Sequence, residues 1–453
     1  MINSTIRFVN HASVIISNKD TSILSDPWFF GDAFHGGWSL LHETSREEIE
    51  EILDQITHIW ISHEHPDHFS VPFFKTYADR IRKNKIQILF QETKDKRVFS
   101  FLSVMFSDVT ELKENQRTEI SEGFSITCIK DGFYDSALLM ENGNEKILNL
   151  NDCDITTEAR ARQLHKLTGD IDVLLTQFSY AAWKGGEFNM AWRAKAAREK
   201  IETIKLQQKT FLPKFIIPFA SFIYFSNNQN KYLNDCANRP SDVTECLKGY
   251  ESQIIVLKPN DCFGGEHPFP KIEESHSFWE EKYNSIPTRE FQNFDEVSFS
   301  GLKDGFEIYC DRIREKNNLL FIKILRAISP IKVFRPVIVR LVDIDSTIEF
   351  DYVYGRIVTS SGQPLLSMQT GSLDFIFRNS FGFDTLTVNG CFEEEAKGGF
   401  LLATRTLAIE NLNNLGVSVS PLSIFRLDLL KTFAVRLFKV ARTMRKTKSK
   451  AAR

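Results

Sequence analysis

Two patterns of hydrophobic and polar residues alternate along the first part of this 453-residue chain. Between residues 5 and 25, short β-branched and aromatic runs separated by polar turns predict two or three strands. Similar runs predict further strands at 57–61, 124–129, 137–140, 146–150, 172–176 and 215–218. Apolar residues at helical spacing within charged segments predict helices at 45–55, 71–81, 156–167 and 191–208. Alternating strands and helices favour sheets whose outer faces are covered by helices.

The later part of the chain has a different pattern and predicts a second domain. The run 267–287 is polar and contains several prolines, so we expect a first domain over 1–270 and a smaller α+β domain over 288–423. Alternating strand-like runs occur within 335–358 and within 366–392. The sequence gives no chemistry for this second domain.

The segment 424–453 is rich in Lys and Arg and nearly free of acids. Its apolar residues recur at helical spacing: Leu427, Leu430, Ala434, Leu437 and Ala441. A basic amphipathic helix of this kind can make a peripheral contact with an anionic membrane surface. The alternative is a helix that docks on its own domain and ends in a frayed basic tail.

Composition narrows the function class only broadly. The 56 Lys and Arg residues nearly balance the 59 Asp and Glu residues, so no overall charge favours binding to nucleic acid. Seven scattered cysteines without a Cys-x-x-Cys pair suit a reducing cytoplasm better than a disulfide framework. The chain shows neither a secretory signal nor an apolar run of about 20 residues. We therefore expect a cytoplasmic protein, membrane-peripheral if the basic tail binds lipid.

The predicted strand 57–61 leads directly into a dense group of metal-ligand side chains, His63, His65, Asp67 and His68. Zn²⁺ and Fe²⁺ favour such nitrogen and oxygen donors. His63 and His65, two positions apart, can reach one ion, whereas Asp67 and His68 point towards a second. Two ions about 3.5–4 Å apart could share a bridging hydroxide. The alternative is a solvated polar loop.

These residues form the His-x-His-x-Asp-His signature of the metallo-β-lactamase superfamily, which the chain resembles. The segments 25–43, 146–153 and 217–222 are similar to the CMP-N-acetylneuraminate hydroxylase family, and weaker similarity continues to about Phe392. The resemblance implies a four-layer αββα sandwich followed by the smaller α+β domain. It also implies one or two divalent ions, Zn, Mn or Fe, held by His63, His65, Asp67, His68 and Asp152, with Asp67 and Asp152 in catalysis. Asp152 would bridge the ions; its alternative role is an ordinary turn or helix cap.

The chain departs from the hydroxylase family at two places. That family begins with a Rieske iron–sulfur domain, whereas the residues before the first strand here contain no Cys or His. The family also places a metal-ligating His after an Asp-Gly turn, where this chain has 131–136 without any His. Asp131, Tyr134 or Asp135 could substitute, or the second metal position could be incomplete.

Several other residues are candidates for contacts around the metals. Trp28, Trp38 and Trp183 could stack on a sugar or base, although tryptophan more often fills a core. The remaining candidates are His35 in a glycine-rich loop, Lys184 as an anion ligand or a solvated side chain, Asp26 as a hydrogen-bond partner that orients a metal ligand, and His11 at the site or as a satisfied core histidine.

Three functions remain open. The first is hydrolysis of an anionic small molecule, such as a sugar or nucleotide derivative, by a metal-bound hydroxide. The second is a non-haem iron oxygenase that resembles the hydroxylase and takes electrons from a separate Rieske-type donor. The third is a non-catalytic binding protein of the same fold.

Overall fold

The computed structural model describes residues 2–132 and 134–422 and divides the chain into two units. The first unit comprises residues 1–293 and 388–390, and the second comprises 294–387 and 391 onward. The predicted basic helix at 424–453 lies outside the described residues. Among those that are described, no helix is long and apolar enough to cross a membrane.

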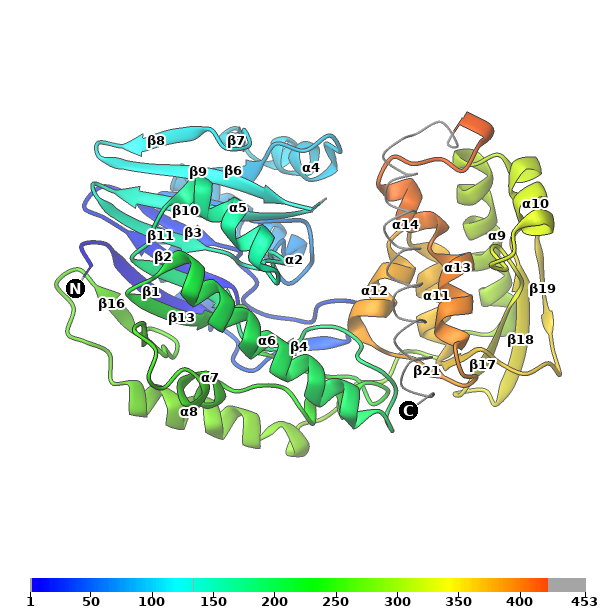
Figure 1. Cartoon of the computed structure of the whole chain (residues 1–453). Coiled ribbons are helices and arrows are strands. Elements are labelled where there is room, and N and C mark those ends of the chain that lie inside the picture. Colours follow the sequence, from blue (N-terminus) through cyan, green and yellow to red (C-terminus); the bar gives the residue numbers. More distant parts are fainter. Residues whose placement is uncertain (1, 133, 423–453) are drawn as a thin grey trace. The chain divides into compact units, whose positions relative to one another are not determined.

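Seven strands form the first sheet of the first unit, in the order β16-β1-β2-β3-β5-β6-β7 (Figure 1). Their bounds are β1 Thr5–Asn10, β2 Ser13–Ser17, β3 Ser22–Ser25, β5 His58–Ile61, β6 Gln87–Gln91, β7 Val109–Leu112 and β16 Cys262–Gly264. The strands β3, β5, β6 and β7 run parallel, so their carboxyl ends lie at one edge of the sheet.

The second sheet also has seven strands, in the order β15-β13-β12-β11-β10-β9-β8. Their bounds are β8 Arg117–Ser121, β9 Phe124–Asp131, β10 Asp135–Asn142, β11 Glu145–Asn149, β12 Val173–Gln177, β13 Phe215–Phe219 and β15 Gln253–Ile254. Here β11, β12, β13 and β15 are parallel, whereas β8 to β11 are antiparallel.

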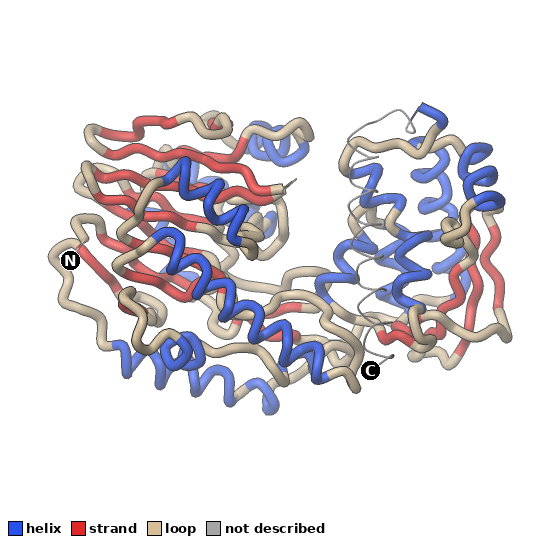
Figure 2. The backbone as a smooth tube through the Cα atoms, viewed as in Figure 1, coloured by secondary structure: helices blue, strands red, loops and turns tan. Residues whose placement is uncertain are grey.

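The two sheets face each other across one apolar core, and helices cover their outer faces (Figure 2). Strand β5 illustrates the alternation: Trp60 lies in the core between the sheets, while Ile59 and Ile61 pack under the helices on the other face. All three are fully buried, as expected for a central parallel strand. The helices on the first sheet are α1 Arg46–Gln55, α2 Val71–Thr76, α3 Ala78–Lys83 and α4 Arg97–Met105; those on the second include α5 Glu158–Thr168 and α6 Met190–Phe211.

This αββα arrangement confirms the predicted fold class, and most of the predicted elements are present. Local signals explain some boundaries well. Helix α1 starts after Ser45, whose hydroxyl accepts a hydrogen bond from the Glu48 amide at 3.2 Å, while the Glu48 carboxylate accepts from the Ser45 amide at 3.0 Å. The helix predicted at 71–81 is interrupted at Tyr77, and the sequence analysis did not identify the elements between residues 84 and 123.

The first unit continues past the predicted boundary at 267–287. That segment contains α8 (Ile272–Asn284), whose Trp279 is 1% exposed and stacks on Phe222 with ring centroids 4.0 Å apart. The Trp279 indole also donates a hydrogen bond to the Leu257 carbonyl at 2.8 Å. Because α8 buries this large side chain in the core of the first unit, the division falls after Asn293. Smaller elements of this unit are β4 Trp38–Leu40, β14 Ile223–Phe225 and α7 Pro240–Cys246.

The second unit contains a five-stranded sheet in the order β19-β18-β17-β20-β21, together with helices. Its elements are α9 Phe299–Lys316, α10 Leu319–Ile328, β17 Val337–Leu341, β18 Ser346–Asp351, β19 Arg356–Thr359, β20 Leu366–Met368, α11 Thr370–Arg378, α12 Gly382–Asn389, β21 Glu393–Glu394, α13 Gly399–Leu407 and α14 Ile409–Asn414. The predicted strand-like run at 366–392 is wrong after Met368. Leu373, Ile376 and Phe377 are fully buried at helical spacing, and the segment forms α11 and α12.

Candidate metal centre

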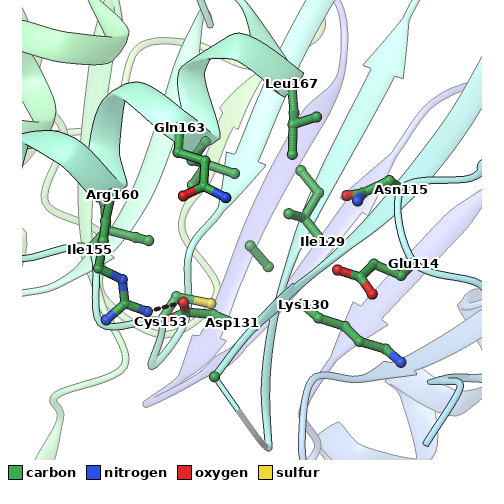
Figure 3. Close-up of a pocket in the computed structure, with 13 residues that line it drawn as sticks. Glu114, Asn115, Ile129, Lys130, Asp131, Cys153, Ile155, Arg160, Gln163 and Leu167 are labelled. Atoms are coloured by element: carbon green, nitrogen blue, oxygen red, sulfur yellow. Dashed lines mark hydrogen bonds and ion pairs between the residues drawn. The ribbon is translucent and has the colours of Figure 1, made fainter. Parts of the chain in front are cut away.

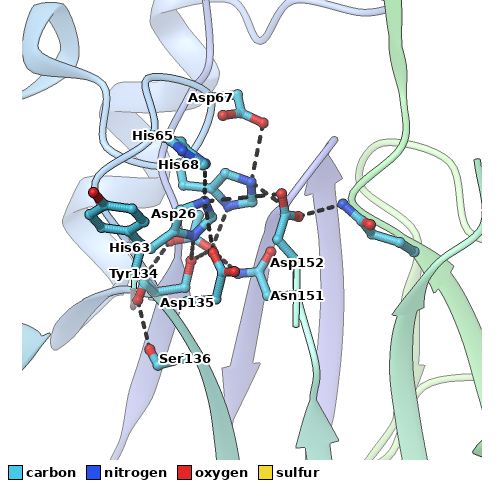
Figure 4. Close-up of polar contacts among 12 residues, drawn as sticks. Asp26, His63, His65, Asp67, His68, Tyr134, Asp135, Ser136, Asn151 and Asp152 are labelled. Carbon is cyan, nitrogen blue, oxygen red and sulfur yellow. Dashed lines mark hydrogen bonds and ion pairs between the residues drawn. The ribbon is translucent and has the colours of Figure 1, made fainter. Parts of the chain in front are cut away.

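The candidate ligands lie where strands of both sheets end (Figure 4). In the first sheet, β5 ends at Ile61 and leads into the loop that carries His63 to His68. In the second sheet, β11 ends at Asn149 and is followed by Asp152, while β10 begins at Asp135. Seven side chains converge here, and we call them the His–Asp cluster: His11, His63, His65, Asp67, His68, Asp135 and Asp152.

His63 lies at the centre of one half of the cluster and is fully buried. Its Nε2 atom is 2.9 Å from Nδ1 of His65, 3.7 Å from Oδ1 of Asp135 and 4.0 Å from Oδ2 of Asp152. Its Nδ1 atom is 2.9 Å from the hydroxyl of Ser62, which fixes the orientation of the ring. Imidazole and carboxylate donors therefore surround one small volume.

His68 lies at the centre of the other half. Its Nε2 atom is 3.2 Å from Oδ2 of Asp67 and 3.4 Å from Oδ1 of Asp152. The same Asp67 oxygen is 3.4 Å from Nε2 of His11, which stands in the turn between β1 and β2. Asp152 thus directs one oxygen towards His63 and the other towards His68.

The fit of these residues to metal ions can be judged from their unsatisfied atoms. Nε2 of His68 is buried within ion-pair distance of two carboxylates but makes no well-aligned hydrogen bond to either, and Oδ1 of Asp67 has no hydrogen-bond partner among the described residues. Donor atoms of the cluster form three groups of three in which all atoms lie within 4.8 Å of one another. Buried polar atoms that converge without well-aligned hydrogen bonds suit a shared cation, and the His and carboxylate donors suit Zn, Mn or Fe.

The charges of the cluster support the same conclusion. Burial lowers the pKa of His68, but the carboxylates of Asp67 and Asp152 more than offset it and hold the pKa well above its usual value. Burial, together with the negative charge of Asp152, raises the pKa of Asp135 to about 8. Both shifts reflect negative charge that is buried close to these groups, and a divalent cation in the cluster would stabilise that charge.

Asp26 is fully buried and contacts the cluster through His68, on the side of the ring that faces away from the other donors. It follows β3, and its Oδ2 lies 3.1 Å from Nδ1 of His68. The Ser62 amide and hydroxyl donate to its two oxygens at 2.8 and 2.9 Å, and the Asn151 side-chain amide also donates to Oδ2. The hydrogen bond that the sequence analysis expected from Asp26 to a candidate ligand is therefore present, and it leaves Nε2 of His68 facing the cluster.

Sequence analysis missed a second support, formed by Gln177 and Lys200. The Gln177 amide nitrogen donates to Oδ1 of Asp152 at 2.5 Å, and the Lys200 ammonium donates to Oε1 of Gln177 at 2.7 Å. Because an ammonium only donates, it fixes which end of the amide faces Asp152. The signal in the sequence was a lysine on the buried stripe of α6, between Ala196 and Ile204.

In the segment 131–136, where the hydroxylase family has a metal-ligating His, this chain places a carboxylate beside the cluster. Of the three proposed substitutes, Asp135 lies beside His63 and His65. Asp131 instead accepts from the Asp154 amide at 2.6 Å and pairs with Arg160. Figure 3 shows the Asp131–Arg160 pair among residues that line a pocket. This pocket has a volume of about 270 Å³, and its lining includes Cys153 and Asp131 but none of the cluster's imidazoles.

The aromatic candidates for substrate contact are core residues. Trp28, Trp38 and Trp183 are 1%, 2% and 6% exposed. Trp28 packs edge-on against His11, Trp38 against Phe34, and Trp183 against Trp192. All three indole rings therefore offer little open face on which a sugar or a base could stack.

The remaining candidates for substrate contact are partly buried. His35 lies in the loop before β4 with a φ angle of 55°. Lys184 lies in the loop before α6, where burial and then the charge of Lys200 lower the pKa of its ammonium. Arg193 on α6 is a further basic residue of this region, but it is fully buried and its guanidinium forms two hydrogen bonds with Asp235 at 2.8 and 2.7 Å.

Comparison with known proteins shows what the first unit is similar to. Residues 5–179 match the family model described as the β-lactamase superfamily domain. The cytidine monophosphate-N-acetylneuraminic acid hydroxylase of Macaca mulatta is 28% identical over 272 residues, which cover 56% of this chain and 44% of that protein. The corresponding inactive hydroxylase of Homo sapiens is 27% identical over the same length, covering 56% of this chain and 52% of that protein. The chain thus spans about half the length of these relatives.

Among solved structures, a possible metal-dependent hydrolase from Veillonella parvula aligns with a TM-score of 0.44 and 17% identity, covering 58% of this chain and 99% of that one. CmlA, a diiron β-hydroxylase from Streptomyces venezuelae, aligns with a TM-score of 0.43 and 13% identity, covering 58% of this chain and 54% of that one. The match of residues 5–179 to the β-lactamase superfamily domain model, the αββα layers and the convergent donors agree with one another.

Proposed function

We propose that this chain is a metal-dependent enzyme that hydrolyses an anionic small molecule at the His–Asp cluster. The carrying observation is Nε2 of His68, buried between Asp67 and Asp152 without a well-aligned hydrogen bond. Burying so many ionisable groups is costly unless they are paired or bind a metal. A protein that used this cluster only for stability would be expected to satisfy these atoms internally.

Two metal positions fit the cluster. His63, His65 and Asp135 form one donor set, and Asp67, His68 and His11 form the other. Asp152 lies between them, with one oxygen towards each half. When bound there, divalent ions supply Lewis acidity that lowers the pKa of water and polarises an acyl or phosphoryl group.

The chain's own residues position and tune this site. Asp26 accepts from Nδ1 of His68, so the lone pair needed for ligation is on Nε2. Gln177, held by Lys200, donates to Oδ1 of Asp152 and limits rotation of that carboxylate. Preorganised groups of this kind do not have to rearrange during the reaction, which lowers its barrier.

Two lysines support the choice of an anionic substrate. Lys200 is linked to Asp152 by hydrogen bonds through the side chain of Gln177. Lys184 is close enough to Lys200 for their like charges to interact. Burial lowers the pKa of each ammonium, although carboxylate charges already act on both groups, because Asp152 favours the charged form of Lys200 and Glu199 that of Lys184. A phosphate or carboxylate group of the substrate could contact these two ammonium groups.

Oxidation is the second candidate, favoured by the similarity to hydroxylases over 272 residues. His and carboxylate donors also suit non-haem iron. The cluster contains no cysteine ligand, so an oxygenase built on it would take electrons from a separate donor, such as a Rieske-type protein.

Anaerobic turnover separates these functions. The metal-loaded protein is assayed under nitrogen against phosphoesters, lactones and N-acyl sugars, with His63→Ala as the inactive control. Hydrolysis with Zn²⁺ or Mn²⁺ under nitrogen is the expected result. Turnover only with iron, O₂ and an added reductant would make the chain an oxygenase, and metal binding without turnover under either condition would make it a binding protein.

A further inference from the structure

Helix α10 of the second unit, which is labelled in Figure 1, carries apolar side chains that are exposed to solvent. Ile322 is fully buried, but Leu320, Ile324 and Ile328 are 70%, 46% and 71% exposed. These three recur at every fourth position and form one stripe along the helix. A surface helix normally presents polar residues on its outer face, so a helix that is apolar on both faces is expected to contact something else.

The surroundings of this stripe are basic. Between Asn317 and Val342 the chain has no Asp or Glu and five cationic residues: Lys323, Arg326, Lys332, Arg335 and Arg340. Arg326 is neutralised by Asp351 at 2.7 Å, and Arg340 lies 3.7 Å from Asp345 and 4.0 Å from Glu395. Lys323 lies 4.9 Å over the ring of Tyr354, which is itself 64% exposed. A tyrosine beside a lysine is a combination that suits the interface of a membrane with water.

We propose that this surface docks on an anionic lipid membrane. We define the α10 surface as Leu320, Ile324, Ile328, Lys323 and Tyr354, together with the exposed residues Ile331, Lys332 and Arg335 that follow α10 directly in the chain. Its apolar side chains would enter the boundary between headgroups and acyl chains, while its cations would contact lipid phosphates and carboxylates. Two copies of the chain facing each other through this surface would bring like charges together, which argues against self-association.

The test uses the full chain and is independent of the enzymatic proposal. Sedimentation with phosphatidylcholine vesicles is compared with sedimentation when the vesicles also contain phosphatidylserine. Binding is expected with phosphatidylserine, and added salt should weaken it. The triple variant Leu320→Ser, Ile324→Ser, Ile328→Ser should lose at least about tenfold in affinity for these vesicles, because it removes the side chains that enter the lipid.

A matched control is Leu401→Ser, which changes a side chain that is 55% exposed in the same unit but outside the α10 surface. It should bind vesicles like the wild type, and an unchanged thermal midpoint shows that each variant is folded. Three results would overturn the proposal: no preference of the wild type for phosphatidylserine, full binding by the triple variant, or a dimer of the wild type that the triple variant abolishes. Full binding by the triple variant would assign the lipid contact to another part of the chain.

Discussion

Oδ1 of Asp135 lies 3.7 Å from Nε2 of His63, at the point where the related hydroxylase family was expected to supply a histidine. Its cross-strand neighbour Asp131 is paired with Asp135 in the β9–β10 register but turns to Arg160. Two carboxylates on adjacent strands thus have different roles, and Asp135 is the one in a position to complete the donor set.

Replacing Asp135 should therefore weaken metal binding. Asp135→Ala removes one oxygen donor beside His63 and His65, and we expect zinc affinity at that position to fall by about tenfold or more. Competition with a chromogenic chelator measures it. The matched control is Asp131→Asn, which should leave zinc affinity unchanged. Equal losses in the two variants would contradict the assignment of Asp135.

A second prediction concerns Asp26, which does not itself face the candidate metals. Asp26→Asn keeps the size of the side chain but removes the charged acceptor for Nδ1 of His68. Metal affinity should fall by about 10–100-fold, because partners behind a ligand orient it and raise its basicity. Titration calorimetry measures the change, with Asp79→Asn at an exposed surface position as the control. An unchanged affinity would show that Asp26 is needed only for folding.

The sequence alone predicted the site residues that are close together in the chain, but not all of those that come from distant segments. His63 to His68 form a local motif after one strand, so their common location was predictable. Asp135 could not be separated from Asp131 and Tyr134, because the choice depends on which side chain turns towards another sheet. Lys200 and Gln177 come from a helix and a strand distant from the motif, and no local pattern joins them. The three tryptophans were candidates for substrate contact, although tryptophan more often fills a core, and their burial favours the core role.

The lysine pair gives a third prediction, on substrate preference. Lys184→Gln should raise KM for an anionic substrate by about tenfold and change kcat little, because the lost charge–charge contact is present in both the ground and transition states. Lys195→Gln is the control, since Lys195 is 67% exposed and interacts with Glu199. Steady-state kinetics against a charged substrate and its neutral ester measure this effect. An equal rise in KM for both substrates would argue against an anion contact.

A fourth prediction tests the extent of the first unit. Trp279 on α8 is buried on Phe222, so Trp279→Ala should destabilise this unit by about 3–5 kcal/mol. Phe269→Ala, at a side chain that is 41% exposed, should cost much less. Thermal unfolding followed by tryptophan fluorescence and circular dichroism measures both. A small effect of Trp279→Ala would mean that α8 does not belong to this core.

The central claim, that the His–Asp cluster binds metal, is tested most directly by the metal content of the purified full chain. Elemental analysis after exhaustive dialysis should find about one to two equivalents of Zn, Mn or Fe per chain. The double variant His63→Ala, His68→Ala should retain almost none, although its circular dichroism should be unchanged. Equal metal content in the wild type and the double variant, or no metal bound by the wild type after incubation with each ion, would contradict the account.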